Sequence, residues 1–399
     1  MDALQAKSCI ANALRCQIPP SLLVAPLTTL SAFRRNEHVK LPSATSPPRR
    51  WIHQTGRMAP PQRPSRRCIP GNMPPRPLIQ PFAPVHSGSG WRGHATASPE
   101  YHSSVQPTIH PIFETRTGTF QYVVADPETK NAAIIDPVLD YDKCTHTITT
   151  TSADALLSLI AEKGYTVVRI METHAHADHL TASFYLQRRL TELQGQKPPV
   201  SIGKRIGRVQ SLFGERYGID AAEYEGVFDE LLEDDQQFDI GKVRAQAIHL
   251  PGHTPDHMGY RIGDNVFCGD SLFHTDIGTA RCDFPGGSAH DLYKSAKKIL
   301  SLPSHVKIWT GHDYPPEGER EAVPAVTVDT HRKENRHVKD DMTEDEFVAL
   351  RSERDAHLAA PRLIHESLQV NVRGGRLPKE NDAGMRLLKL PLKVKSPVL

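Results

Sequence analysis

The spacing of hydrophobic and polar residues changes several times along the chain, and each change predicts an element. Apolar runs at 120–124 and 132–135 alternate with turn residues, which predicts two or three antiparallel strands. Residues 152–164 repeat apolar side chains at helical spacing, so we expect a helix that Ser152 caps and Gly164 ends. A buried strand is predicted directly after it, within "YTVVRIMET", and the next helix at 182–193.

Further strands are predicted in the second half of the chain, at "VSIG", "VRAQAIHLPGHT", "NVFCGD" and "KIWTGHD". Residues 290–302 have the pattern of an amphipathic helix. From Thr343 onward the pattern predicts one capped helix followed by irregular structure. Antiparallel strands mixed with helices predict an α/β fold in which two sheets lie between outer layers of helices.

Composition divides the chain into a leader and a body. Sixteen of the 33 prolines and 13 of the 48 basic residues lie within residues 1–100, together with only three acidic residues. An Arg-rich, Ser-rich, acid-poor segment is typical of a transit peptide, so we predict a disordered leader at 1–104 and a mitochondrial-matrix protein. The alternatives are a Pro-rich tail without targeting function and a cytoplasmic location.

The body is acidic, because 35 basic and 43 acidic residues remain after the leader is set aside. This balance argues against nucleic acid or an anionic membrane as a partner. No run reaches the ~20 apolar residues that a membrane span requires. The six cysteines form no paired spacing, which argues against a disulfide framework and against a thiolate zinc site.

Candidate metal ligands follow four predicted strands. The stretch "ETHAHADH" contains four of them, and three more lie in "PGHT", "CGD" and "TGHD". Together they give five imidazoles and two carboxylates, which suit zinc, iron or manganese. A single histidine is usually not a ligand, but four separate strand ends with such residues predict a metal site. These residues are His174, His176, Asp178, His179, His253, Asp270 and His312.

The order HxHxDH, GHT, GD and GHDY resembles the metallo-β-lactamase superfamily, whose fold is an αββα sandwich. The resemblance covers about 108–320, and it implies a metallo-β-lactamase domain at 105–325 with a small C-terminal extension at 326–399 that packs on it. In the dinuclear hydrolases of the superfamily, one metal is held by the positions of His174, His176 and His253. The other is held by the positions of Asp178, His179 and His312, and that of Asp270 bridges the two.

Within the superfamily, "ETHAHADHLTAS", "GTARCDFPGG" and "GHDY" are similar to the persulfide dioxygenases, relatives of glyoxalase II. This resemblance implies a single Fe(II) held by His174, His253 and Asp270, a two-His-one-carboxylate set. His176, Asp178, His179 and His312 then surround the metal without holding it. The implied substrates are glutathione persulfide and O2, and a homodimer is conceivable.

Glutathione carries two carboxylates, so cationic groups are expected beside the metal. Arg281 is the first candidate, with a structural salt bridge to Asp283 as the alternative. Tyr314 is a second candidate, with simple packing as its alternative, and the charged run "HRKENRH" offers Arg332 and Arg336.

Three functions therefore stay open from the sequence. The first is a glutathione-persulfide dioxygenase with one Fe(II). The second is a glyoxalase II-type hydrolase with two zinc ions, because both functions share every ligand residue. The third is a metal-dependent binding protein without turnover, which is disfavoured because no ligand position is degraded.

Overall fold

The computed structural model describes residues 105–395, and the predicted leader lies outside them. Two six-stranded sheets form the centre of the fold, in the strand orders β1-β2-β3-β6-β8-β9 and β10-β11-β12-β13-β14-β15. The first sheet comprises β1 (Thr108–Glu114), β2 (Thr119–Ala125), β3 (Asn131–Ile135), β6 (Thr166–Met171), β8 (Val200–Gly203) and β9 (Glu230–Leu232).

The second sheet comprises β10 (Gln237–Ile240), β11 (Val243–His249), β12 (Met258–Ile262), β13 (Asn265–Phe267), β14 (Lys307–Trp309) and β15 (Ala325–Thr327). A smaller sheet contains β4 (Val138–Asp142), β5 (Thr147–Thr149) and β7 (Leu180–Thr181). The helices are α1 (Thr151–Lys163), α2 (Ser183–Gln194), α3 (Ile206–Tyr217), α4 (Ala289–Leu300), α5 (Val328–Glu334), α6 (Glu344–Ala356) and α7 (Ile364–Asn371).

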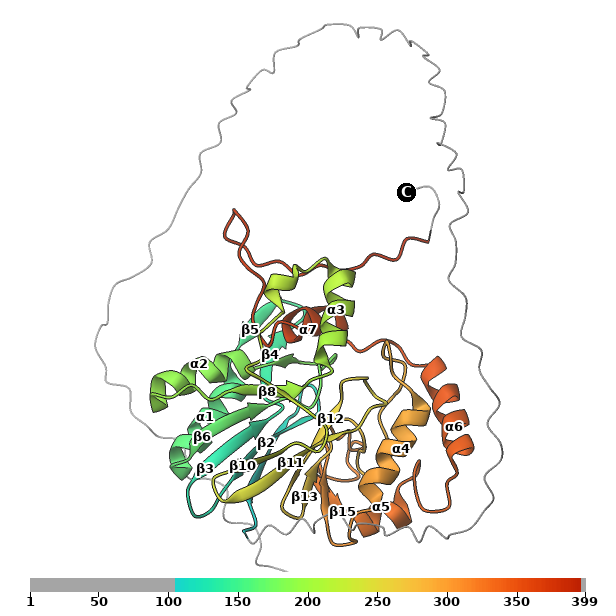
Figure 1. Cartoon of the computed structure of the whole chain (residues 1–399). Coiled ribbons are helices and arrows are strands. Elements are labelled where there is room, and N and C mark those ends of the chain that lie inside the picture. Colours follow the sequence, from blue (N-terminus) through green and yellow to red (C-terminus); the bar gives the residue numbers. More distant parts are fainter. Residues whose placement is uncertain (1–104, 396–399) are drawn as a thin grey trace, which may run out of the picture. The chain divides into compact units, whose positions relative to one another are not determined.

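Three hydrophobic clusters show that the elements form four layers. Alternation along β2 explains the first two clusters, because Val123 packs toward α1, α2 and α3 while Tyr122 and Val124 pack between the sheets. The third cluster joins the second sheet to α4 and α6. Helices therefore cover both outer faces, as Figure 1 shows, and the predicted αββα sandwich is confirmed.

Most predicted elements are present, and two predictions about their details are wrong. The first helix does end at Gly164, which adopts the left-handed conformation (φ 65°), but its N-cap is Thr150. Ser152 lies within the first turn, where its backbone N–H and its hydroxyl both donate to Asp140 on β4. A contact with a neighbouring strand thus replaces the expected capping role.

The C-terminal region is more ordered than the pattern indicated. The predicted helix after Thr343 is α6, and Thr343 closes a capping box with Glu346. The segment that we expected to be irregular contains α7, whose last six residues are all buried. The proposed boundary at 325/326 falls inside β15, a strand of the second sheet.

The described residues include no helix that combines the length and the apolar character required to cross a membrane.

Candidate metal centre

The predicted ligands lie at the ends of strands from both central sheets. His174 and its neighbours follow β6, His253 follows β11, Asp270 follows β13 and His312 follows β14. The stretch "ETHAHADH" leads into β7, which precedes α2. Since β6 is in the first sheet and the other three strands are in the second, the site lies where the two sheets meet.

Two glycines leave room for Asp270. Gly269 has φ 46°, and a Cβ atom there would lie 2.6 Å from the hydroxyl of Thr173. A Cβ atom on Gly311 would lie 2.6 Å from Oδ1 of Asp270. A residue with a side chain fits neither position. The glycines of the "GD" and "GH" motifs, Gly269 and Gly311, therefore allow two loops to approach closely at the site.

His174, His253 and Asp270 form one group of converging ligand atoms, which lie within 4.8 Å of one another. Oδ2 of Asp270 is 4.0 Å from Nε2 of His174 and 3.6 Å from Nε2 of His253. All three residues are buried. Within residues 105–395, neither Nε2 of His174 nor Oδ1 of Asp270 has a hydrogen-bond partner. Buried polar atoms normally have partners, so these atoms fit a metal ion.

Neighbouring groups orient the two imidazoles of this set. The hydroxyl of Thr173 donates to Asp136 (2.8 Å), so its oxygen accepts from Nδ1–H of His174 (3.0 Å). Nδ1–H of His253 donates to the carbonyl of Arg281 (2.8 Å). Each ring therefore carries its proton on Nδ1 and directs the lone pair of Nε2 toward the centre, the tautomer that a metal ligand requires.

His257 holds Asp270 in place and was not identified from the sequence. Its Nε2 accepts the backbone N–H of Asp270 at 2.9 Å, and burial holds the pKa of His257 well below its usual value. A neutral ring can accept this hydrogen bond, whereas a protonated ring cannot. The spacing GHTPDH placed His257 beside His253, but no pattern indicated that it faces the next strand.

His176 is engaged by two carboxylates. Its Nε2 lies 3.1 Å from Asp136 and 3.2 Å from Glu172, and all three residues are buried. Burial opposes the charge on the ring, but Asp136 and Glu172 outweigh it and raise the pKa of His176. Nδ1 of His176 has no partner in the described part of the chain. His176 therefore has one nitrogen free for a metal.

Contacts also link the other three residues that are predicted to surround a single iron, namely Asp178, His179 and His312. Oδ2 of Asp178 lies 3.2 Å from Nδ1 of His179 and 3.2 Å from Nε2 of His312. Burial opposes ionisation, but His312 and His179 hold the pKa of Asp178 far below its usual value. His176, Asp178 and His179 also offer ligand atoms within 4.8 Å of one another. All seven predicted residues thus lie in one site, and their geometry is compatible with one or two metals.

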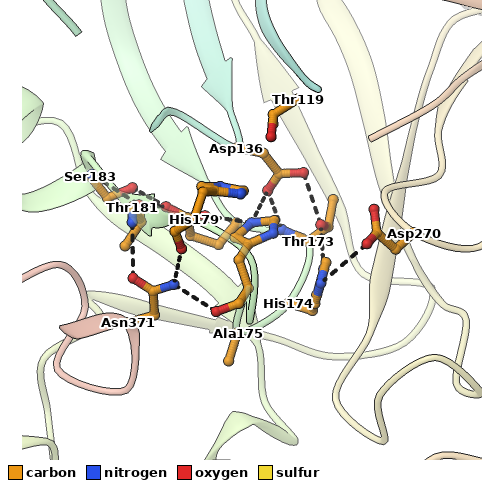
Figure 2. Close-up of polar contacts among 12 residues, drawn as sticks. Thr119, Asp136, Thr173, His174, Ala175, His179, Thr181, Ser183, Asp270 and Asn371 are labelled. Carbon is orange, nitrogen blue, oxygen red and sulfur yellow. Dashed lines mark hydrogen bonds and ion pairs between the residues drawn. The ribbon is translucent and has the colours of Figure 1, made fainter. Parts of the chain in front are cut away.

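Figure 2 shows polar contacts around His174, His179 and Asp270. Asp136 and Glu172, which no sequence pattern had singled out, both contact His176. Glu172 accepts from the hydroxyls of Thr181 and Ser183 through Oε1 and contacts His176 through Oε2. Asn371 of α7 reaches the same loop. None of these residues belongs to a repeated pattern, so a single sequence gave no signal for them.

A cavity of about 520 Å³ opens beside Asp178, His253 and Asp270. Five arginines line it, and these are Arg116, Arg281, Arg351, Arg354 and Arg362. Among residues 105–395, the only acidic side chains in its lining are Asp178 and Asp270, both at predicted ligand positions. The cavity is therefore cationic apart from its metal end, and it suits an anionic ligand.

Both predicted substrate-binding residues line this cavity. The guanidinium of Arg281 binds Asp283 through Nε and Nη2 and the carbonyl of Ala359 through Nη1 (2.7 Å). The salt bridge considered as its alternative role is therefore present. Tyr314 stacks on the ring of His312, with ring centroids 5.7 Å apart.

Arg332 and Arg336 do not line the cavity. Arg332 pairs with Asp340, and Arg336 donates to the carbonyl of Asp276. Cys282 is partly buried, and burial raises the pKa of its thiol to about 12, so the thiol stays protonated at neutral pH.

Known proteins resemble this chain over its body. A family model described as the metallo-beta-lactamase superfamily matches residues 115–312. Glyoxylase B2 of Dictyostelium discoideum is 43% identical over 289 residues, which cover 71% of this chain and 96% of that protein. A beta-lactamase hydrolase-like protein of Xylella fastidiosa is also 43% identical, over 287 residues, and the match covers 72% of this chain but only 65% of that protein.

A more distant likeness links the chain to persulfide dioxygenases. The human mitochondrial persulfide dioxygenase ETHE1 is 29% identical over 270 residues, which cover 67% of this chain and 88% of that protein. The crystal structure of ETHE1 from Myxococcus xanthus matches with a TM-score of 0.53 and 26% identity, covering 67% of this chain and all of that one.

Proposed function

The chain belongs to the metallo-β-lactamase superfamily, and within it we propose that the protein is a persulfide dioxygenase. In the proposed reaction, glutathione persulfide, O2 and water give glutathione and sulfite. The metal is proposed to be one Fe(II) per chain. The observation that carries the proposal is the convergence of two imidazoles and one carboxylate, His174, His253 and Asp270, beside a cationic cavity.

This ligand set fits ferrous iron. A two-His-one-carboxylate set holds Fe(II) and leaves coordination positions for a sulfur ligand and for O2. Thr173 and the carbonyl of Arg281 fix the ring tautomers, and His257 fixes the backbone of Asp270. These contacts preorganise the donors before any metal arrives.

The cavity supports a substrate with separate anionic groups. Glutathione persulfide carries two carboxylates and an anionic sulfur. Among the five cavity arginines, Arg362 is exposed. Its side chain makes no hydrogen bond or ion pair with another group within residues 105–395. Arg281 and Arg351 are already paired with Asp283 and Asp355. We therefore assign the carboxylates of the substrate first to Arg362 and Arg354.

A glyoxalase II-type hydrolase is the second candidate. The specific observation in its favour is the second convergent group, His176, Asp178 and His179, which could hold another metal. The relative named Glyoxylase B2 is also more similar in sequence than ETHE1 is. A thioester of glutathione would present the same two carboxylates to the cavity.

One experiment separates the two candidates. The full chain is purified without oxygen, its metal content is measured, and O2 uptake is followed with glutathione persulfide; S-lactoylglutathione is assayed in parallel. We expect about one iron per chain and O2 consumption that depends on the persulfide. Two zinc ions per chain, thioester cleavage and no O2 uptake would instead establish the hydrolase.

A mitochondrial location remains part of the proposal, carried by the composition of residues 1–104. Fusion of this segment to a fluorescent protein tests it. Diffuse cytoplasmic fluorescence would contradict import.

A further inference from the structure

The last helix of the fold contacts the metal-binding loop directly. Asn371, at the end of α7, donates from its side-chain amide to the carbonyls of His176 and His179, both at 2.8 Å. Its side-chain oxygen accepts the backbone N–H of Thr181 at 2.9 Å. Figure 2 shows the side chain of Asn371 directed at this loop. One side chain therefore ties down three backbone groups of "HADHLT", about 190 positions away in the sequence.

These contacts determine which way the amide of Asn371 faces. Two of its partners are carbonyls and need a donor, whereas the third is an N–H and needs an acceptor. A primary amide is the neutral side-chain group that supplies both donors and an acceptor from one plane. Asn371 is only 3% exposed, so water does not replace it. Its loss would leave three backbone groups of the loop without this partner.

The segment 176–181, which Asn371 holds, carries three of the seven candidate ligands, namely His176, Asp178 and His179. The carbonyls of His176 and His179 bracket Asp178, so fixing both sets the turn on which Asp178 lies. Thr181 is held from two sides, because its N–H binds Asn371 and its hydroxyl binds Glu172, which contacts His176. The backbone position and the orientation of His176 are thus set by connected hydrogen bonds.

We infer that Asn371 is a positioning residue of the metal centre: through the backbone of residues 176–181, it sets the affinity and the geometry with which the loop holds metal. It touches neither metal nor substrate. This inference concerns metal binding and holds for both candidate functions by different routes. With two metals the loop supplies ligands directly, and with one iron it acts through His174, which lies two residues before His176. It also makes α7 part of the site, in place of the appended role that we expected for residues 326–399.

The same helix provides a matched control. Gln369 is also a buried amide on α7, with 2% of its surface exposed. Its side chain binds the backbone N–H and the carbonyl of Lys389 and the carbonyl of His365, away from the metal loop. Gln369→Ala therefore removes a similar number of buried hydrogen bonds from α7 without touching the loop.

The test compares Asn371→Ala, Asn371→Asp and Gln369→Ala in the full chain. Cobalt(II) affinity is measured by competition with a chelator, the visible cobalt spectrum is recorded, and thermal unfolding is followed without metal. We expect both Asn371 variants to lose about 10- to 100-fold in cobalt affinity and to shift the spectrum. Asn371→Asp preserves volume but faces two carbonyls with an acceptor. Gln369→Ala should change the affinity less than about threefold, even where it lowers the Tm as much.

Unchanged cobalt affinity and spectrum in the folded Asn371 variants would overturn the inference and leave Asn371 a purely structural residue. An equal loss in Gln369→Ala would overturn it as well. If neither Asn371 variant folds, hydrogen exchange on the wild-type protein decides: the amide of Thr181 should exchange slowly and by global opening. Fast exchange at Thr181 would contradict the hydrogen bond from its backbone N–H to Asn371, and with it the inference.

Discussion

The floor and the wall of the cavity are built in different ways. The floor, defined as the metal-binding group His174, His253 and Asp270, consists of buried side chains at strand ends, oriented by bonds to neighbouring groups. His253 and Asp270 line the cavity, whereas His174 does not. The wall is contributed by α6 and the segment that follows it, and comprises Arg351, Arg354, Leu358, Pro361, Arg362 and Leu363. Arg354 and Arg362 of the wall are exposed.

This difference predicts separate roles for the floor and the wall. A buried floor residue has one geometry, and its removal leaves unpaired polar atoms in a low-dielectric site. An exposed wall charge interacts through solvent, so its removal weakens binding without disturbing the metal. We therefore propose that the floor provides the metal centre, whose ligand positions both candidate functions share, and that the wall selects the substrate.

The largest effect is expected for Asp270→Ala. Asp270 is the only carboxylate in the floor, and its loss leaves two imidazoles to hold the metal. We expect metal content near zero and a loss of activity of about 10³-fold or more. Metal analysis and steady-state kinetics measure both quantities. Asp239→Ala, which removes an exposed carboxylate near Arg244, is the control and should retain both. Full metal content in Asp270→Ala would contradict the assignment of the floor.

A smaller effect on metal content is expected for His312→Ala. Nε2 of His312 contacts Asp178 at 3.2 Å and Asp270 at 3.4 Å, so it supports the floor from the side. With a single metal, iron content should stay near one per chain while activity falls about tenfold or more. Loss of metal to the same degree as in Asp270→Ala would show that the centre holds two metals. His174, His253 and Asp270 would then no longer differ in role from the other four candidate ligands.

The floor could be predicted from the sequence because local signals coincide there. Each ligand follows an apolar strand, and short motifs with glycine mark the close approach of the loops. The orienting residues could not be predicted in the same way. Asp136 follows β3, His257 precedes β12 and Asn371 ends α7, and only the folded chain brings them to the site.

The missed helix α7 has a physical explanation. Residues 366–371 are all buried although four of the six are polar, so this part of the helix has no solvent-exposed face. A periodic hydrophobic pattern arises only when one face meets water, and therefore no such pattern is visible. The misplaced cap of α1 has another cause, because Asp140 on β4 engages Ser152 and tertiary contacts override the local preference.

Removal of charge from the wall should affect substrate binding alone. For Arg362→Met we expect KM to rise about tenfold with kcat unchanged, because a charge-assisted hydrogen bond to a substrate carboxylate contributes about 1.5–3 kcal/mol. Arg189→Met is the matched control, since Arg189 pairs with Glu192 on α2 and does not line the cavity. Steady-state kinetics with glutathione persulfide measure the effect. A fall in kcat at constant KM would mean that the wall acts on the chemistry and not only on binding.

The smallest effect concerns the support of the wall and its dependence on pH. His337 is buried between Thr279 and Arg354, and burial, with Arg351, Arg354 and Arg336 nearby, lowers its pKa to about 3. In the unfolded chain the ring of His337 binds a second proton below about pH 6.5, whereas in the folded chain the ring stays neutral down to about pH 3. The free energy of unfolding therefore falls as the pH is lowered between these values.

For His337 we expect a loss of about 2 kcal/mol between pH 7.5 and pH 5, because pH 5 lies about 1.5 pH units below the pKa of the unfolded histidine. Urea unfolding of the metal-free protein at both pH values measures it, and His337→Gln provides the comparison because glutamine does not titrate. All other histidines are the same in both proteins, so the difference between wild type and variant isolates His337. The variant should lose less stability on acidification than the wild type. Equal losses would show that His337 is solvated in solution, and that the wall rests less firmly on the fold than the floor does.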